Sequence, residues 1–412
     1  MADYGKYFLM KAADAAEFAR ARLDMFRGSG PLEYAEIGDG NLNYIFRIVD
    51  PATGRSAVLK QAGDTARISD QFKVSPDRNR IEYDILRIQN ELAPGLVPKV
   101  FHYDSVMNCC AMEDLSDHAI MRGALLQRRR FPLFADHVTT FMVNTLLDTS
   151  DAVIDHKRKK ATVGNFINPD LCEITEDLVY TEPFNDVKGR NDVFPPNKEF
   201  IERELYRDKR ILLETAKMKF DFLCNAQSLI HGDLHTGSIF VTEKSTKMID
   251  PEFAYYGPAG YDVGNVIANL IFAWANADTL MGEGRDGFTG WLEDTIRDVM
   301  RLFIGKWRAR WAEKVTEVTA KYEGFADWYL NGILRDTAGV TGLELCRRIV
   351  GIAHVKDITS IADPSARVRA ERLCIAAAKR FILERERFRT GDEYLAAVKE
   401  AAALFPRTEA GR

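Results

Sequence analysis

Two acidic segments in the second half of the chain have residue types suited to phosphoryl transfer. Asp233 lies in a polar loop, residues 231–237, between an apolar helix end and a strand, where a carboxylate is both held and reachable. Asp250 and Glu252 follow the next expected strand. Magnesium prefers such hard oxygen ligands, takes few protein carboxylates and completes its shell with phosphate and water. In phosphoryl transfer one carboxylate orients the attacking hydroxyl and another holds the metal, so the two segments supply both groups.

The order of the parts argues for function more strongly than any single carboxylate does. A lone aspartate is more often a solvated or capping group. Here a His-Gly-Asp loop is followed by Ser238, by a hairpin expected over residues 238–241 and 247–250, and by Ile-Asp-Pro-Glu. We therefore interpret the whole segment as a catalytic loop followed by a metal-binding turn.

The first part of the chain offers groups that could hold a nucleotide. Gly38 and Gly40 lie at the expected turn of a hairpin, where missing side chains let the backbone approach phosphates. Lys60 ends an apolar strand and could pair with phosphates, and Glu82 on the next helix could hold that lysine in place. A strand-end lysine is usually solvated, but the order of glycine turn, strand lysine and helix glutamate favours a phosphate-binding role.

These groups require two lobes to bring them together, and 412 residues exceed what one hydrophobic core usually organises. The patterns predict an α+β fold with a small β-sheet-plus-helix lobe over 1–112 and a larger, mainly α-helical lobe over 113–412. Glu113, Asp114 and Leu115 would lie where the lobes meet, with a backbone able to read an adenine edge. Residues 155–200 show no assignable pattern. The expected elements are helices over 6–27 and from Pro76, capped by Ser75, and strands over 42–49, 57–60, 97–103 and 109–112.

Composition excludes some classes of partner and location. The formal net charge is −5, from 56 basic and 61 acidic residues, so no positive excess indicates a nucleic acid or an anionic membrane. The six cysteines lack metal-site or redox spacing and are expected to be buried thiols. The first residues do not resemble a secretory signal, and the longest apolar stretch, 266–275, is too short to span a bilayer. We therefore expect a cytoplasmic protein.

The motifs together resemble a known family. They are similar to the protein-kinase-like superfamily that includes aminoglycoside and choline kinases, and within it to the 5-methylthioribose kinases of methionine salvage. The similarity extends from about residue 34 to the C-terminal helices. It is carried by residues 38–44 (GDGNLNY), 112–118 (MEDLSDH), 231–240 (HGDLHTGSIF), 249–253 (IDPEF), 257–258 (GP) and 260–264 (GYDVG).

The resemblance implies a role for each matching residue. Asn43 and Lys60 would contact ATP, and residues 113–115 would form the hinge. Asp233 would bind the sugar and act as catalytic base, and Asp262 would brace the catalytic loop. Asp250 and Glu252 would bind metal and phosphates. Ser238 and Glu252 stand where protein kinases have a metal-binding Asn and a Gly, so a protein substrate is not expected.

The resemblance also implies substrate contacts outside the catalytic loop. The family's paired arginines match Arg347 and Arg348, which share one polar helix face with Glu344. Guanidinium groups suit phosphate and sugar oxygens, and a nearby acid can hold their planes. A solvated polar face is the alternative for this pair. Where the family commonly presents a tryptophan over the substrate, this chain offers Phe72.

The expected function is transfer of a phosphoryl group from ATP, with Mg²⁺, to the 1-hydroxyl of 5-methylthioribose by a homodimeric enzyme, with a small-molecule sugar as its partner. Two alternatives stay open. One is a kinase of the same fold that acts on another alcohol, such as an aminoglycoside, choline or homoserine. The other is a nucleotide-binding pseudokinase that regulates a partner.

Overall fold

Alternating apolar residues in the first part of the chain form a five-stranded antiparallel sheet, with strand order β1-β2-β3-β7-β6. Lys60 lies in the middle of this sheet, because the strand registers pair it with Ile45 on one side and Cys110 on the other. The computed structural model describes residues 4–37, 43–63, 65–66, 69–280 and 283–407, with side chains omitted at 65–66, 69–73 and 283–284. The strands of the sheet are β1 (Glu33–Glu36), β2 (Asn43–Val49), β3 (Ser56–Ala62), β6 (Val100–Asp104) and β7 (Cys109–Glu113). A separate ribbon pairs β4 (Thr65–Ala66) with β5 (Ser69–Lys73).

Two helices pack with this sheet, and both differ in extent from the expectation. The first, α1 (Ala12–Arg22), is shorter than 6–27, because the chain is extended again at Leu23. The second, α2 (Arg78–Leu92), begins two residues after Pro76, and its N-cap is Asp77 rather than Ser75. The Ser75 hydroxyl instead accepts the Asp77 N–H at 3.2 Å, within a turn that precedes the helix.

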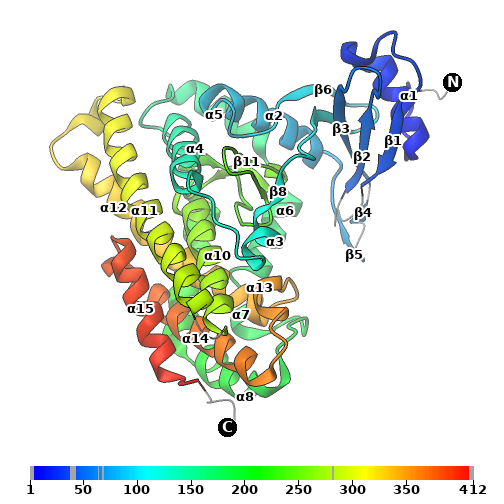
Figure 1. Ribbon diagram of the computed structural model, residues 1–412. Coiled ribbons are helices and arrows are strands. Elements are labelled where there is room, and N and C mark those ends of the chain that lie inside the picture. The colour runs from blue at the N-terminus through cyan, green and yellow to red at the C-terminus, as the bar shows by residue number, and fades with distance from the viewer. Residues whose placement is uncertain (1–3, 38–42, 64, 67–68, 281–282, 408–412) are drawn as a thin grey trace.

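Helices make up most of the larger lobe (Figure 1). The stretch over 155–200, which has no assignable sequence pattern, contributes some of these helices. The helices are α3 (Met121–Leu126), α4 (Phe134–Asp148), α5 (His156–Val163), α6 (Pro169–Leu178), α7 (Glu182–Asn185), α8 (Lys198–Ile201), α9 (Lys209–Cys224), α10 (Gly260–Asp278), α11 (Glu283–Lys314), α12 (Phe325–Val350), α13 (Lys356–Thr359), α14 (Pro364–Leu383) and α15 (Gly391–Leu404).

The core of this lobe is built around α10, whose residues are buried along its whole length. Two of its glycines let it approach α12 closely: a Cβ at Gly260 would lie 2.6 Å from the Thr337 backbone nitrogen, and one at Gly264 would lie 2.8 Å from the Thr337 carbonyl oxygen. Any larger residue at these positions would force the two helices apart. The helix therefore packs directly on α12, the element that carries both predicted arginines.

Short strands carry the predicted catalytic segment. The hairpin expected after Ser238 is present as β10 (Ile239–Val241) and β11 (Thr246–Met248), and β8 (Ala119–Ile120) extends it. Its second strand ends at Met248, before the predicted 250. A second pair, β9 (Ser228–Ile230) and β12 (Tyr255–Gly257), brackets the same segment. The loop that contains Asp233 thus leaves one strand pair and enters the other.

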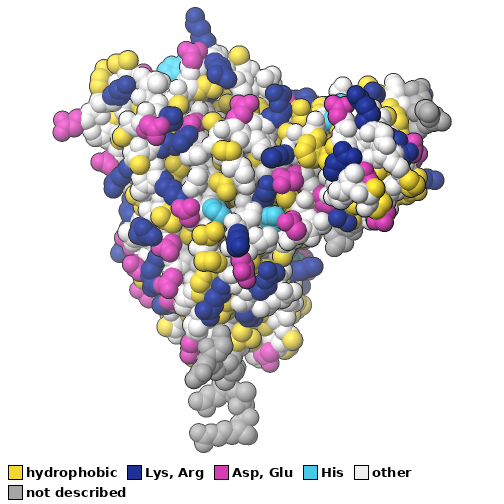
Figure 2. Space-filling model, turned by 45° about the horizontal axis from the view of Figure 1, so that its top comes forward, with side chains coloured by type: hydrophobic (Ala, Val, Ile, Leu, Met, Phe, Trp, Pro, Cys, Tyr) yellow, Lys and Arg dark blue, Asp and Glu magenta, His cyan; other side chains and the backbone are white. Residues whose placement is uncertain are grey.

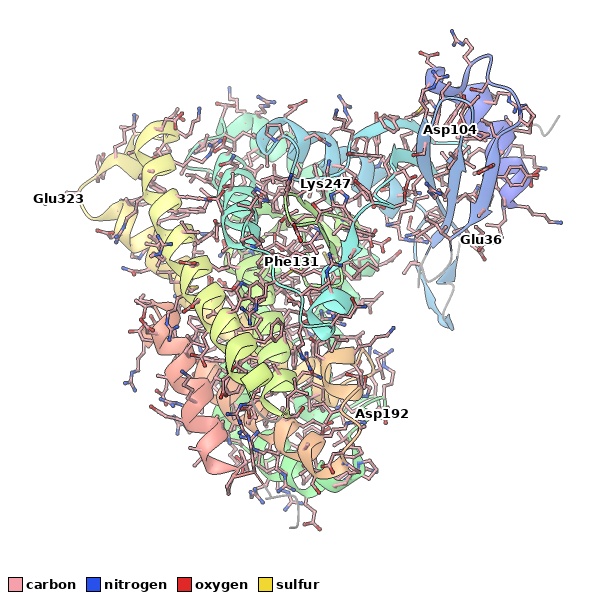
Figure 3. The ribbon with its side chains drawn as sticks, in the orientation of Figure 1. Glu36, Asp104, Phe131, Asp192, Lys247 and Glu323 are labelled. Carbon is pink, nitrogen blue, oxygen red and sulfur yellow. The ribbon has the colours of Figure 1, made fainter. Side chains whose placement is uncertain are left out.

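The two lobes meet beside this hairpin. Lys247, labelled in Figure 3, donates its ammonium to both carboxylate oxygens of Glu113 at 3.0 and 2.8 Å, which joins β11 to the end of β7. Helix α2 packs against the 3₁₀ turn Pro251–Phe253. The division of the chain between residues 112 and 113 stays a prediction, and β7 spans it.

Figure 2 shows positive and negative side chains interspersed over the visible face. None of the helices within the described ranges is both long and apolar enough to cross a membrane.

Four of the six cysteines are buried thiols as predicted, but Cys172 is only half-buried and Cys224 is exposed.

Candidate active site

The loop that carries Asp233 is held through its backbone, which contacts Phe253 and the side chain of Asp262. Gly232 adopts φ +81°, and a Cβ there would lie 2.4 Å from the Phe253 carbonyl oxygen, so only glycine fits. The Asp262 carboxylate accepts the N–H groups of His231 at 2.7 Å and Gly232 at 3.0 Å. Burial raises the pKa of Asp262 to about 7, against the opposing effect of these two bonds. The predicted bracing role of Asp262 is thus visible in its contacts.

His231 links the loop to the strand that leads into Asp250. Its Nε2 lies 2.9 Å from the Ile249 carbonyl oxygen, and its Nδ1 accepts the Asp233 N–H at 3.3 Å. A carbonyl oxygen can only accept, so the ring carries its proton on Nε2. Burial lowers the pKa of His231 to about 4, so the ring is neutral near pH 7. One neutral imidazole therefore fixes the spacing between the two acidic segments.

Lys60 joins the small lobe to the second acidic segment. Its ammonium lies 2.8 Å from Glu82 Oε2 and 2.7 Å from Asp250 Oδ1, and its side chain is only 5% exposed. Burial alone would lower the pKa of Lys60, but the charges of Asp250 and Glu82 outweigh it and raise the pKa well above the usual value. The predicted order of strand lysine, helix glutamate and metal-turn aspartate is therefore one connected group of charges.

The side chains of Asp250 and Glu252 differ in solvent exposure. The Asp250 side chain is 43% exposed, and its backbone is left-handed at φ +60°, a sparsely populated conformation that recurs at functional sites. The Glu252 side chain is 10% exposed, and its Oε2 accepts the amide of Asn43 at 2.9 Å. Arg78 donates to the Asn43 oxygen at 3.1 Å. Asn43, predicted to contact ATP, thus has both ends of its amide in contact with protein groups.

This pair of carboxylates fits magnesium in its chemistry. Both supply hard oxygens, and the more exposed Asp250 can offer one to solvent. Within the part of the chain that the structure describes, no group of three or more His, Cys, Asp and Glu side chains is arranged to hold a metal ion. A magnesium ion bound here would therefore depend on phosphate and water oxygens for most of its ligands, as magnesium usually does beside a nucleotide.

The predicted hinge at Glu113, Asp114 and Leu115 lies at the end of β7. The Glu113 N–H is donated to the Lys99 carbonyl at 2.8 Å, and the Leu115 carbonyl accepts the His118 N–H at 2.9 Å. The Asp114 side chain is paired with Arg47 at 2.7 Å. An adenine edge would therefore be read by other backbone groups of this segment.

Arg347 and Arg348 lie beside Asp233 at the C-terminal end of α12. Glu344, 1% exposed, accepts from Nε of both arginines, at 2.9 Å for Arg348. Burial would raise the pKa of Glu344, but the two guanidinium charges lower it to about 2. Because the arginine side chains are only 11% and 9% exposed, the alternative of a solvated polar face is wrong.

Both guanidinium groups face the carboxylate of the catalytic loop. Asp233 Oδ1 lies 3.5 Å from Arg347 Nη2 and 3.8 Å from Arg348 Nη2. The Asp233 side chain is 24% exposed, so a ligand can reach it. The structure therefore joins the predicted substrate residues of α12 to the predicted base.

Two further predictions fall outside what the structure describes. Gly38 and Gly40 lie outside the described residues, and Phe72 belongs to β5, whose side chains are not described. Several groups that hold the site had no role assigned from the sequence, although two of them belong to the 231–240 motif: Arg78, Arg122, Asn168, His231, His235 and Asn269.

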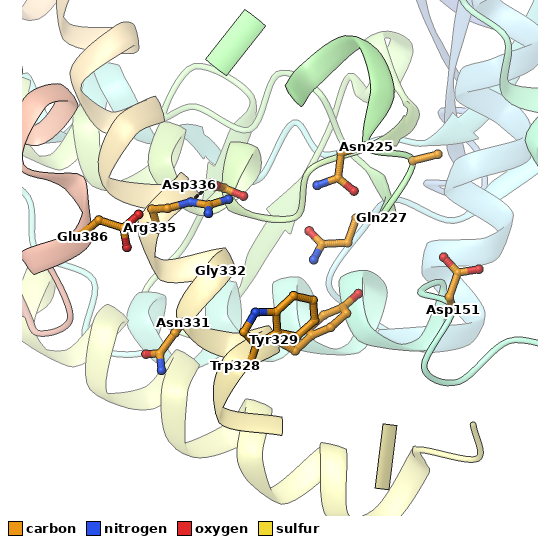
Figure 4. A pocket seen from close by; sticks show the side chains of 11 residues that line it. Asp151, Asn225, Gln227, Trp328, Tyr329, Asn331, Gly332, Arg335, Asp336 and Glu386 are labelled. Atoms are coloured by element: carbon orange, nitrogen blue, oxygen red, sulfur yellow. Dashed lines mark hydrogen bonds and ion pairs between the residues drawn. The ribbon is translucent and has the colours of Figure 1, made fainter. Parts of the chain in front are cut away.

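A cavity of about 580 Å³ lies apart from this chemistry. It is lined by residues that follow α9 and by side chains of α12, among them Gln227, Trp328 and Asp336 (Figure 4). None of the predicted site residues lines it. The charged residues around Asp233 and Asp250, and not this cavity, therefore form the candidate active site.

The fold and the site together define a phosphotransferase of the protein-kinase-like class: a sheet lysine held by a helix glutamate faces an acidic turn, beside a braced His-Gly-Asp loop. Residues 195–302 match the model of the phosphotransferase enzyme family. A choline kinase from Cryptosporidium parvum has a TM-score of 0.47 and 12% identity, covering 95% of this chain and 96% of that chain.

Curated relatives match nearly the full length of the chain. A methylthioribose kinase of Bacillus pumilus is 38% identical, covering 92% of this chain and 94% of the relative. Those of Geobacillus kaustophilus and Erwinia tasmaniensis are 39% and 36% identical, covering 94% and 96% of this chain and 94% and 99% of the relatives. The chain belongs to the methylthioribose kinase family.

Proposed function

We propose that the protein phosphorylates the 1-hydroxyl of 5-methylthioribose, using ATP and magnesium, to give 5-methylthioribose 1-phosphate in methionine salvage. The observation that carries this proposal is the 36–39% identity to methylthioribose kinases over more than nine tenths of the chain. The charged groups around Asp233 and Asp250 support it because their types and contacts suit this reaction.

The donor side would use the junction of the two lobes. Lys60, held by Glu82, would contact the phosphates of ATP, and residues 113–115 would face the adenine. Magnesium on Asp250 and Glu252 would supply charge neutralisation for the phosphates. Asn43 and Arg78 would act on this turn by holding Glu252.

The acceptor side would use the catalytic loop and α12. Asp233 would accept the proton of the 1-hydroxyl as that oxygen bonds to the γ-phosphorus and the bond to the leaving ADP oxygen breaks. Arg347 and Arg348 would bind sugar and phosphoryl oxygens and offset the developing charge. Two buried guanidinium groups disfavour a cationic acceptor such as an aminoglycoside or choline, which would be repelled.

A coupled assay of ADP release tests the substrate against the alternatives. We expect turnover with 5-methylthioribose, and little or none with ribose, choline or kanamycin. Turnover with choline or kanamycin alone would contradict the assigned acceptor. Absence of ADP release with every acceptor, together with retained ATP binding, would favour a pseudokinase.

Arg348→Ala is expected to lower kcat/KM for 5-methylthioribose by a factor on the order of 10², because one buried charge-assisted contact contributes a few kcal/mol. The KM for ATP is expected to stay within about threefold. Lys60 and Asp250, the groups proposed to bind ATP, belong to the charged group that joins the lobes and not to the one around Asp233 and Arg348. Steady-state kinetics with each substrate varied in turn measures both effects.

Arg335→Ala, which removes a partly exposed arginine of the same helix, is the matched control and should behave as wild type. Equal losses for sugar and nucleotide in Arg348→Ala would show that the arginine does not select the acceptor.

Cytoplasmic location and a homodimeric state remain predictions. Sedimentation of the purified protein would measure its oligomeric state.

A further inference from the structure

His235 lies two residues after the proposed base and is held in one orientation by the turn that follows it. Its Nδ1 accepts the backbone N–H groups of Gly237 and Ser238, each at 3.1 Å. An imidazole nitrogen that accepts from two N–H groups cannot itself carry a hydrogen. The proton of the neutral ring is therefore on Nε2.

That protonated nitrogen faces Asp233. Nε2 of His235 lies 3.4 Å from Asp233 Oδ2, whereas the guanidinium groups of Arg347 and Arg348 lie nearest to Oδ1. The separation is longer than a formed hydrogen bond, as is common for catalytic contacts before substrate binds. The two oxygens of the carboxylate thus have different neighbours.

The ring packs closely against the backbone of Gly237. A Cβ on Gly237 would lie 2.8 Å from His235 Cε1 and 2.9 Å from Arg122 Nη1, so the glycine allows the ring and the guanidinium to pack against the loop. Arg122 is anchored by the Asn269 side-chain oxygen at 2.8 Å. Burial, together with the charges of Arg122 and Arg348, holds the pKa of His235 well below its usual value, so the ring stays neutral.

We propose that His235 is a positioning residue that donates Nε2–H to Asp233 Oδ2 in the loaded enzyme and so leaves Oδ1, the oxygen beside the arginines, to orient the acceptor hydroxyl. The neutral tautomer suits this task because Nδ1 is occupied and the ring cannot take the proton away from Asp233. The inference rests on the proposed role of Asp233.

Two substitutions at His235 distinguish the contact made by Nδ1 from the contact made by Nε2. His235→Asn keeps an acceptor at the place of Nδ1 for the turn but has no group at the place of Nε2. His235→Gln keeps a donor at the place of Nε2 but loses the acceptor that holds the turn. A purely structural histidine would tolerate the first change better than the second.

For turnover, we expect His235→Asn to be more damaging than His235→Gln. His235→Asn should lower kcat with 5-methylthioribose by a factor on the order of 10 to 10², because a misplaced base loses most of its effect. Its KM for ATP and its melting temperature should stay near wild type. His235→Gln should keep kcat within about fivefold of wild type although its melting temperature falls. His156→Asn, on an exposed histidine, is the control.

The outcomes separate this inference from the proposed function. Absence of wild-type turnover with 5-methylthioribose would overturn the assignment of this substrate. The kcat values of the two variants would then be measured with the acceptor that does support ADP release. A kcat in His235→Asn equal to or above that in His235→Gln would overturn the positioning role. A ¹⁵N spectrum of the wild-type protein with a protonated Nδ1 at His235 would overturn it without any activity measurement.

Discussion

Asp233→Asn is expected to lower kcat by a factor on the order of 10² or more, while ATP binding stays within about twofold of wild type. The amide keeps the shape of the side chain but cannot accept the proton of the attacking hydroxyl. The arginines remain held by Glu344, so the surrounding charges keep their places. Lys60 and Asp250, the groups proposed to bind the nucleotide, are left intact by the change.

Coupled ADP release gives kcat, and calorimetric titration with a non-hydrolysable ATP analogue gives nucleotide affinity. Asp117→Asn, on an exposed carboxylate of the loop after β7, is the control and should leave both values unchanged. Turnover close to wild type in Asp233→Asn would remove the basis for assigning it as the base.

Asp250→Asn is expected to lower kcat by about 10² to 10³, because it removes a charged group that we propose lies beside the transferring phosphate. It should also raise the magnesium concentration needed for half-maximal rate. Asparagine tolerates the left-handed backbone that Asp250 adopts, so the change removes charge and not conformation. Lys60 keeps Glu82 as a partner, so no buried ammonium is left without a counter-charge.

Initial rates measured over a magnesium titration at fixed ATP check this expectation. Asp233→Asn provides the comparison, because its lower rate should come with an unchanged magnesium dependence. An identical magnesium dependence in wild type and Asp250→Asn would argue that the ion is held elsewhere.

The sequence predicted the charged residues of the site better than it predicted the residues that hold them in place. Lys60 and Glu82 were linked by their order along the chain, and the structure pairs them directly. Arg347 and Arg348 were linked to Glu344 by helical spacing, which brings i, i+3 and i, i+4 side chains together. These predictions succeeded because the pairing partners are local in sequence or follow a common motif.

Most of the groups that were missed act across long sequence separations. Asn168 donates to the Glu252 carbonyl oxygen at 2.8 Å from a region without an apolar period, so no pattern marked it. Arg78 holds Asn43 and Glu252 from the start of α2, where it resembled an ordinary helix-end arginine. The tautomer of His235 depends on the four-residue turn over 235–238, which composition does not determine. The predicted helix boundaries were wrong for local reasons: the chain is extended at Leu23, and the Ser75 hydroxyl accepts the Asp77 N–H in a turn before α2.

The close glycine-mediated packing of α10 on α12 has a consequence for how acceptor choice can change. Helix α10 begins with the segment that braces the Asp233 loop, and α12 ends with the two arginines, so the proposed acceptor groups form one rigid unit within the larger lobe. The proposed donor groups are divided between the lobes, as the Lys60–Asp250 pair shows. A relative of this enzyme could therefore acquire a new alcohol through substitutions near the end of α12, while its nucleotide chemistry was inherited unaltered.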